Sequence, residues 1–247
     1  MSDYASAGRG IENYGLTLWN GGRIVNNGIL TPLQSAFLKS FFGTTAGSRF
    51  FLTGGTALAG FYLYHRLSKD LDLFTLDDDA LAAVDREIQG IVARLGCHIG
   101  RARREEHFRQ FLLVPQDDPD AIPLQVDMVR DFGPQFGRRK TINGIIVDAI
   151  ENIGANKINA ILGRTESKDF VDLYFILKAG YDFDDLFAKA KQKDPGLLEF
   201  FFAGALLQVN RLTLLPEMRK PLDWPTMQAF FITIANRMMD RLSPELT

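Results

Sequence analysis

The sequence predicts an α+β protein, in which a mixed sheet flanked by helices is followed by an all-helical lobe. Short apolar runs of strand length alternate with helical patterns up to about residue 147. From residue 148 onward, apolar residues recur at helical spacing and no strand pattern returns. We therefore expect an N-terminal arm at 1–30, a sheet-containing core at 31–147 and a helical C-terminal lobe at 148–247.

Length and composition are those of an ordinary globular protein. The 247 residues are 46% hydrophobic and 23% charged, which is enough to bury a large core. A net charge of −2 gives no general attraction to nucleic acid or to an anionic membrane, so such contacts would need local basic patches. A single cysteine excludes an internal disulfide, and no apolar run approaches the roughly 20 residues of a membrane span. We expect a cytoplasmic protein with no membrane partner.

The first core element is predicted to be a helix that begins at Thr31. Thr31 has the form of an N-cap, with Pro32 in the first turn and Gln34 three residues further on. Apolar residues at helical spacing continue to about Phe42, so one face of this helix is expected in the core.

A strand, a glycine turn and a second strand follow. The apolar run 50–52 predicts a buried strand that ends at Gly54-Gly55, where backbone without Cβ can approach a ligand closely. A helix is expected to open there, and a helix N-terminus attracts anions. The second strand alternates acidic and apolar residues, which places Asp70 and Asp72 side by side on one face.

Two adjacent carboxylates need a partner that relieves their repulsion. At roughly 4 Å and an effective dielectric of about 20, the repulsion is on the order of 4 kcal/mol. Magnesium binds one or two carboxylates together with substrate phosphates, so the aspartates and the glycine turn suit a metal–polyphosphate complex. Thr56 could then donate to a phosphate, and Arg66 could support the aspartates. The alternative is an ordinary turn and a solvated carboxylate pair held by Arg66 or Lys69.

The next segments predict a helix and a hairpin. The acidic run 77–79 suits a loop and N-cap before a helix at 79–95, and two extended segments, 97–103 and 107–114, suit a hairpin. Three arginines on or beside this hairpin form either a solvated face or a basic rim for an acceptor nucleic acid: Arg101, Arg103 and Arg104.

A further strand is predicted at 124–129, and its one acidic side chain is Asp127. The ordinary interpretation is a strand aspartate that pairs with Arg130 or faces solvent. Residues 132–141 suit a loop, and 145–147 suit a short strand. The core is expected to end there.

Helices are predicted for the rest of the chain. An amphipathic helix at 150–162 is followed by a short joint and a second helix at 168–178, which carries Asp169 and Asp172 on one face. Apolar periodicity interrupted by prolines predicts further helices over 182–245.

Two stretches resemble the AbiEii/AbiGii toxin family, a branch of the nucleotidyltransferase superfamily that includes DNA polymerase beta. The stretch FLTGGTALAGFYLYHRLSKDLDLF at 51–74 is similar to the family's Gly-Gly-Thr-Ala-Leu start and H-R-x-S-x-D-L-D ending. The stretch NKINAILGRTESKDFVDLYFIL at 156–177 is similar to its third and fourth motifs, a lysine within a helix and then R-x-x-x-(K/R)-D-x-x-D-L. The resemblance implies a nucleotidyltransferase-type core.

The residues and the resemblance together give a set of expected ligands. Three aspartates would hold two divalent ions, magnesium in the first place and manganese as an alternative: Asp70, Asp72 and Asp127. Asp127 enters this set because the superfamily places a third carboxylate on a neighbouring strand. The expected nucleotide-binding residues lie in the glycine turn and the family motifs: Gly54, Gly55, Thr56, Arg66, Lys157, Arg164 and Asp172.

The helical motifs leave several roles open. By the resemblance, Lys157 would reach a bound nucleoside triphosphate as a point charge and would count, with the aspartates, as catalytic. Asp169 would also be catalytic, because it would orient Lys157, contact the nucleotide or assist proton removal. Alternatively, Arg164 with Asp169 or Asp172 is a structural ion pair at the helix joint.

The resemblance implies transfer of a nucleoside monophosphate from a nucleoside triphosphate to an RNA, with tRNA as a natural candidate, or to a protein. Pyrophosphate would leave, and the protein would be the toxin of a toxin–antitoxin pair with a genetically linked antitoxin. Two other interpretations stay open: a nucleotide-binding regulatory module with little transferase activity, and hydrolysis of phosphodiesters by the same carboxylates. Hydrolysis would not obviously need Gly54-Gly55 or Lys157.

Overall fold

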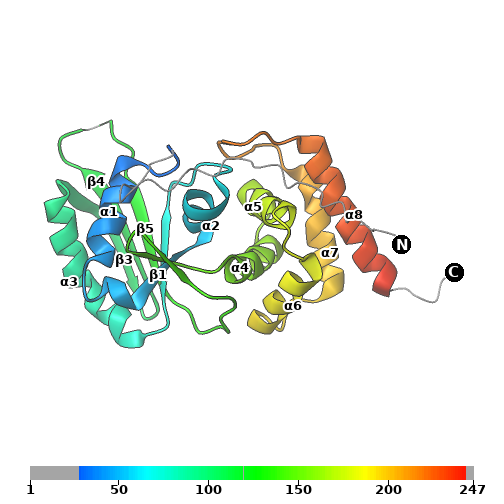
Figure 1. Cartoon of the computed structure of the whole chain (residues 1–247), viewed down its shortest axis with the longest axis horizontal. Helices are drawn as coiled ribbons and strands as arrows, with labels where there is room; N and C mark the ends of the chain where they lie inside the picture. Colours follow the sequence, from blue (N-terminus) through cyan, green and yellow to red (C-terminus); the bar gives the residue numbers. More distant parts are fainter. Residues whose placement is uncertain (1–27, 119, 243–247) are drawn as a thin grey trace, which may run out of the picture.

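The computed structural model describes residues 28–118 and 120–242, so the arm expected at 1–30 lies almost entirely outside the described residues. Figure 1 shows a sheet with helices on both faces and a group of further helices beyond one face. The α+β fold class is therefore confirmed, with a mixed sheet first and helices at the C-terminal end. Within the described parts of the chain, no helix is long and apolar enough to cross a membrane.

The sheet has seven strands in the order β3-β4-β5-β2-β1-β7-β6. It is mixed, because β1 runs antiparallel to β2 and parallel to β7, while β2 runs parallel to β5. The strands, in chain order, are β1 (Phe50–Thr53), β2 (Leu71–Thr75), β3 (Cys97–Glu105), β4 (Phe108–Pro115), β5 (Leu124–Arg130), β6 (Lys140–Ile142) and β7 (Ile145–Val147).

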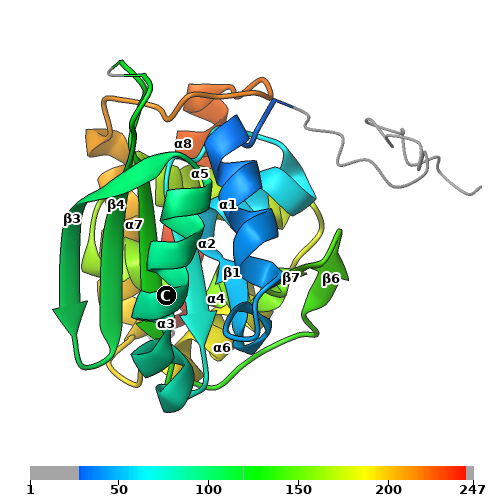
Figure 2. The same cartoon turned by 90° about the vertical axis from the view of Figure 1, so that its left-hand side faces the viewer.

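Two helices pack on one face of the sheet, α1 (Pro32–Phe42) and α3 (Asp78–Arg94), as Figures 1 and 2 show. The predicted capping box of α1 is present, since Thr31 and Gln34 exchange side-chain hydrogen bonds with each other's backbone N–H. The predicted N-cap of α3 is also confirmed, because the Asp77 side chain accepts from two backbone N–H groups.

The opposite face carries α2 (Gly54–Leu58) with its π turn (Ala59–Leu63), and beyond it the C-terminal helices. These are α4 (Ile150–Gly163), α5 (Ser167–Lys178), α6 (Phe183–Lys193), α7 (Glu199–Leu207) with a 3₁₀ turn (Gln208–Arg211), and α8 (Trp224–Leu242). One cluster of buried side chains runs from the strands through all of these helices. The expected division after residue 147 stays a prediction.

Two local predictions are wrong. The loop expected at 132–141 ends earlier, because Lys140 begins β6, which pairs with β7 across an Asn143-Gly144 turn with positive φ at both residues. The helices expected over 182–245 are interrupted at 212–223, which contains no helix. This segment connects the 3₁₀ turn after α7 to α8, and it pairs with the loop before β2 through the bridge between Arg66 and Met218.

Candidate active site

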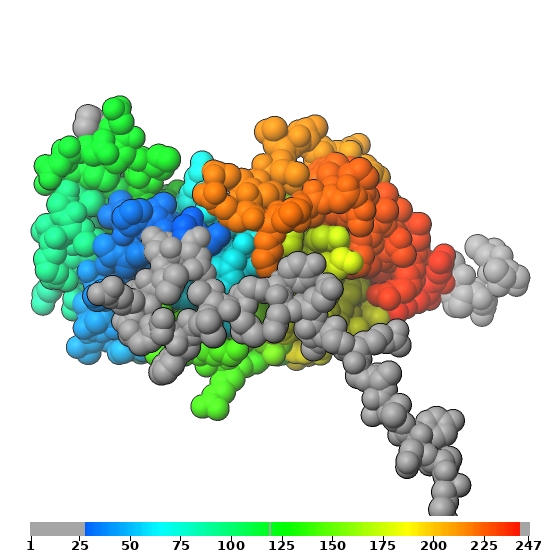
Figure 3. Space-filling view, turned by 45° about the horizontal axis from the view of Figure 1, so that its top comes forward, coloured from blue at the N-terminus to red at the C-terminus, as the bar shows by residue number. Residues whose placement is uncertain are grey.

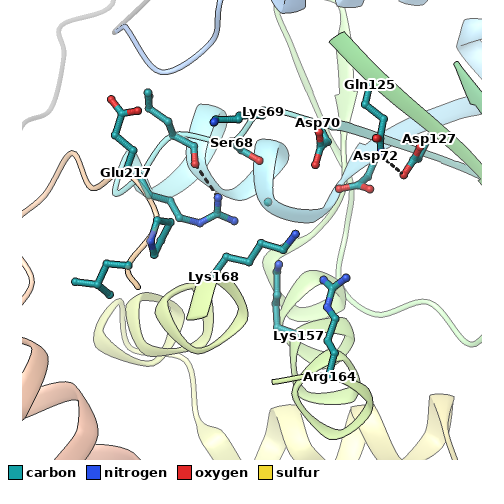
Figure 4. A pocket seen from close by; sticks show the side chains of 15 residues that line it. Ser68, Lys69, Asp70, Asp72, Gln125, Asp127, Lys157, Arg164, Lys168 and Glu217 are labelled. Carbon is teal, nitrogen blue, oxygen red and sulfur yellow. Dashed lines mark hydrogen bonds between the residues drawn. The ribbon is translucent and has the colours of Figure 1, made fainter. Parts of the chain in front are cut away.

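A cavity of about 490 Å³ lies between the sheet and the C-terminal helices. Figure 4 shows its two walls. Asp70, Asp72 and Asp127 lie on the strand side, and Lys157 and Lys168 rise toward them from α4 and α5. The structure thus brings the three expected aspartates and the expected lysine to one place.

Strand register brings the aspartates together. On the parallel neighbours β2 and β5, Asp72 lies directly opposite Asp127. Leu71 and Leu73 alternate with the acidic positions and are buried in the core. The predicted alternation is therefore confirmed, and it leaves Asp70 and Asp72 half-buried on the cavity side.

The carboxylates of Asp70 and Asp72 lack partners. Among the described residues, none donates a hydrogen bond to either carboxylate or forms an ion pair with it. The alternative in which Arg66 or Lys69 holds these two aspartates is therefore not seen. The pKa of Asp72 is raised to about 6, chiefly by burial; the charge of Lys157 opposes this rise, and the charges of Asp127 and Asp70 contribute to it. Burial likewise raises the pKa of Asp70.

Asp127 is held differently. Its two carboxylate oxygens accept hydrogen bonds from the side-chain amides of Gln110 and Gln125, at 2.9 and 3.0 Å. Among the residues that the structure describes, no three acidic, histidine or cysteine side chains are gathered closely enough to share a metal ion. The donor chemistry nevertheless fits a divalent ion, because Asp70 and Asp72 offer uncompensated oxygen ligands and each Asp127 oxygen keeps acceptor capacity.

The glycine turn is shaped by the aspartate beside it. Gly54 has a φ of +66°, and a Cβ there would collide with the carboxylate of Asp72. A Cβ at Gly55 would collide with the guanidinium of Arg66. The hydroxyl of Thr56 is buried and donates to the backbone carbonyl of Asp70, so it has no proton left for a phosphate. Thr56 instead fixes α2 to the start of β2.

The ammonium of Lys157 bridges two buried carboxylates. It lies 2.8 Å from Asp169 Oδ1 and 2.7 Å from Asp172 Oδ2. Burial opposes ionisation of Asp172, yet the charges of Lys157 and Arg66 hold its pKa well below the usual range. Burial also opposes ionisation of Asp169, whose pKa is lowered by Lys157 and by Arg164. Both carboxylates are therefore charged and fully occupied.

Two arginines contact the same buried carboxylates. Arg66 donates from Nε and Nη2 to Asp172, at 2.6 and 2.7 Å, and the imidazole of His65 lies 2.8 Å from the same carboxylate. Arg66 therefore supports Asp172 instead of Asp70 and Asp72. Arg164 donates to Asp169 at 2.8 Å, which is the ion pair that the sequence left as an alternative.

Comparison with a known family covers both the sheet and the C-terminal helices. The family profile described as "Nucleotidyl transferase AbiEii toxin, Type IV TA system" matches residues 36–233. The chain belongs to the AbiEii nucleotidyltransferase family. A search of curated proteins gives no match.

Solved structures agree with this AbiEii fold. JHP933 from Helicobacter pylori superposes with a TM-score of 0.54 at 22% identity, covering 86% of this chain and 91% of that one. MenT4, a nucleotidyltransferase toxin from Mycobacterium tuberculosis H37Rv, gives a TM-score of 0.51 at 15% identity, covering 84% of this chain and 82% of that one. At these identities the likeness concerns the fold.

One cation of the AbiEii cavity, Lys168, was not predicted from the sequence. Lys168 lines the cavity with a side chain that is 39% exposed, and its charge lowers the pKa of both Asp70 and Asp72. Its ammonium also lies 3.0 Å from Glu166. A signal was present, because Lys168 occupies the K/R position directly before Asp169 in the family motif.

The non-helical segment 212–223 forms part of the cavity wall, and no sequence pattern predicted this. Leu215, Pro216 and Glu217 line the cavity. The backbone N–H of Leu67 donates to the carbonyl of Glu217, and two N–H groups of the segment donate to the carbonyl of His65. Figure 3 shows the segment in orange, lying over the cyan residues between α2 and β2.

Proposed function

We propose that this AbiEii protein transfers a nucleoside monophosphate from a nucleoside triphosphate to a hydroxyl of an RNA or protein acceptor, with release of pyrophosphate. The observation that carries the proposal is the contrast between the two cavity walls. Asp70 and Asp72 line the cavity and form no ion pair with any described residue, whereas Lys157 and Lys168 line the opposite wall. Such a site suits a metal-bound polyphosphate, whose metal would meet the carboxylates and whose phosphates would meet the lysines.

The strand wall is proposed to hold the metal. Asp70, Asp72 and Asp127 would bind two divalent ions, most simply magnesium. When bound, such ions supply charge neutralisation at the phosphate oxygens and a lowered pKa of the acceptor hydroxyl. The Gly54-Gly55 turn lies against Asp72 and keeps side chains away from this part of the cavity.

The helical wall is proposed to bind the triphosphate. Lys157 has three N–H donors, of which Asp169 and Asp172 take two, and it lines the cavity, so one donor is left for a phosphate. Lys168 is the more accessible ammonium and is proposed as a second phosphate ligand. Asp169 and Asp172 then orient Lys157 and Arg66, because their buried carboxylates have no room for a direct nucleotide contact.

The family description also supports a biological setting. A type IV toxin–antitoxin family implies an antitoxin partner, and we propose that this chain is the toxin. The acceptor would be an RNA hydroxyl in the first place, with a protein hydroxyl as the alternative.

Radiolabelled nucleoside triphosphates test the proposal directly. The protein is incubated with magnesium and a mixture of total RNA and protein, beside the Asp72→Asn variant as the inactive control. Label on a macromolecule with the wild type alone supports transfer. Bound but unreacted nucleotide would make the protein a regulatory binding module, and RNA shortening without label would make it a hydrolase.

A further inference from the structure

The face of the sheet that carries the aspartates continues beyond the cavity to the edge strand. Strand register pairs Asp72 with Asp127, Asp127 with Gln110, and Gln110 with Arg103. Directly opposed residues place their side chains on the same face of a sheet. Arg103 therefore lies on the aspartate face, three strand spacings or about 14–15 Å from Asp72.

A second row of paired residues runs beside the row from Asp72 to Arg103. Arg101 pairs with Leu112, and Leu112 pairs with Gln125, which lines the cavity and donates to Asp127. Two arginines thus project from the same face of β3, at the far end of two rows that start at the cavity.

A β-bulge gives the arginines this direction. Ile99 pairs with the buried Leu113 and Arg101 pairs with Leu112, so Gly100 is an extra residue in β3. Without the bulge, Arg101 would share the face of Ile99, because side chains two residues apart in a strand lie on the same face. The extra residue reverses that alternation and aims Arg101 and Arg103 away from α3.

The aspartate face of these strands is open. On β4, Phe111 and Leu113 are buried on the α3 side, whereas Gln110 and Leu112 are partly exposed on the other. Arg104, one residue from Arg103, lies on the α3 side, where it pairs with Asp85 of that helix. Figure 2 shows β3 and β4 at the outer edge of the sheet, with α3 beside them in front of the sheet.

The charges on this face fit a polyanion. Arg101 is exposed and forms no ion pair with any described residue. Arg103 pairs with Glu105, but both side chains are at least half exposed, so a phosphate can replace the carboxylate. Arginine binds phosphate in a bidentate manner, and Arg103 also lies over the ring of Phe108, at 5.6 Å from its centre. Basic side chains interleaved with aromatic rings are typical of single-stranded nucleic-acid surfaces.

We propose that the open face of β3, β4 and β5 binds the single-stranded 3′ end of an RNA acceptor. Arg101 and Arg103 bind phosphates, and the terminal ribose hydroxyl reaches Asp72 and Asp127. The distance from Asp72 to Arg103 is one that a few nucleotides span. This inference rests on the proposed transferase function for the reaction at the cavity, but the RNA contact itself can be measured without any reaction.

The test compares two variants of β3, one on each face of the sheet. Arg101→Ala/Arg103→Ala removes the proposed contacts, and Arg104→Ala is the matched control on the α3 face. The probe is a fluorescent single-stranded RNA of about 12 nucleotides with a free 3′ hydroxyl. We expect the double variant to bind this RNA at least tenfold more weakly. The slope of log affinity against log salt concentration should decrease by the amount expected for the loss of about two phosphate contacts. The control should stay within about twofold of the wild type, because its arginine lies away from the RNA.

Transfer assays then separate this inference from the proposed function. The double variant should show a raised KM for RNA, an unchanged affinity for the nucleoside triphosphate and an unchanged kcat. Arg101→Lys/Arg103→Lys should recover part of the RNA affinity, since lysine keeps the charge. Arginine-dependent RNA binding without transfer would overturn the proposed function alone. Equal RNA binding by the wild type and the double variant, or labelling of protein alone, would overturn the RNA surface.

Discussion

Replacing Asp72 by asparagine should stabilise the metal-free protein while abolishing transfer. In the folded chain the pKa of Asp72 is raised from its ordinary 3.8 to about 6, chiefly by burial. Above both values, keeping this carboxylate charged costs about 3 kcal/mol at 1.36 kcal/mol for each tenfold change in proton affinity. Because Asp72 is only half-buried, solvent screens part of this cost. We therefore expect Asp72→Asn to raise the free energy of unfolding by about 1–3 kcal/mol at pH 8.

The pH dependence has a definite sign. A raised pKa means that the folded state holds the proton more tightly than the unfolded state, so this group destabilises the fold as pH rises from 3.8 through 6. The advantage of Asp72→Asn should therefore fall to about half at pH 5, between the two pKa values. Urea unfolding at pH 5 and pH 8, with all divalent ions chelated, measures both numbers.

A matched control and a metal titration complete this experiment. Asp117→Asn removes an exposed carboxylate in the turn between β4 and β5 and should change stability by less than about 0.5 kcal/mol. Adding magnesium should stabilise the wild type and leave Asp72→Asn unchanged, because ligand binding to the native state raises its stability. Loss of stability in Asp72→Asn at pH 8 would show that the fold itself holds the carboxylate. An equal gain at both pH values would show that the gain does not come from a raised pKa of Asp72.

Three further changes probe the other parts of the cavity. Lys157→Met removes the cation between the buried carboxylates of Asp169 and Asp172, so it should lower the free energy of unfolding by about 3–5 kcal/mol in urea titrations. A loss below about 1 kcal/mol would show that these ion pairs do not stabilise the helical wall. Lys168→Met should keep the stability within about 0.5 kcal/mol but weaken nucleoside triphosphate binding at least tenfold by calorimetry, and unchanged affinity would exclude it as a phosphate ligand. Gly54→Ala should lower both the melting temperature and magnesium affinity, because its φ of +66° and the Asp72 carboxylate leave no place for a methyl group; wild-type values for both would contradict this.

The sequence predicts those features of the site that depend on local spacing. Alternation with period two is enough to place Asp70 and Asp72 on one face, and the capping box of Thr31 and Gln34 is likewise a local pattern. The Asn143-Gly144 hairpin signal was equally local, and it could have been used to predict β6.

Other features depend on contacts between residues that are distant in the chain, and local patterns in a single sequence do not reveal such contacts. Arg66 lies four residues from Asp70, so the sequence suggests that they pair, but the fold brings it to Asp172, 106 residues away. The parallel register that sets Asp127 opposite Asp72 has no local signal beyond the family resemblance. A strand read with strict alternation also gives the wrong face for Arg101, because the bulge at Gly100 appears only when β3 pairs with β4.

The two walls of the cavity together explain why Asp70 and Asp72 form no ion pair with any described residue. Lys157 and Arg66 are close enough for their charges to lower the pKa of Asp72 or Asp70, yet neither forms an ion pair with them. Their hydrogen bonds go to Asp169 and Asp172, which are fully buried and hold the cations on the helical wall. Without those buried acids, the nearest cations would be free to neutralise the strand carboxylates and so to compete with a metal ion. Asp169 and Asp172 thus leave Asp70 and Asp72 available for the divalent cation that we propose.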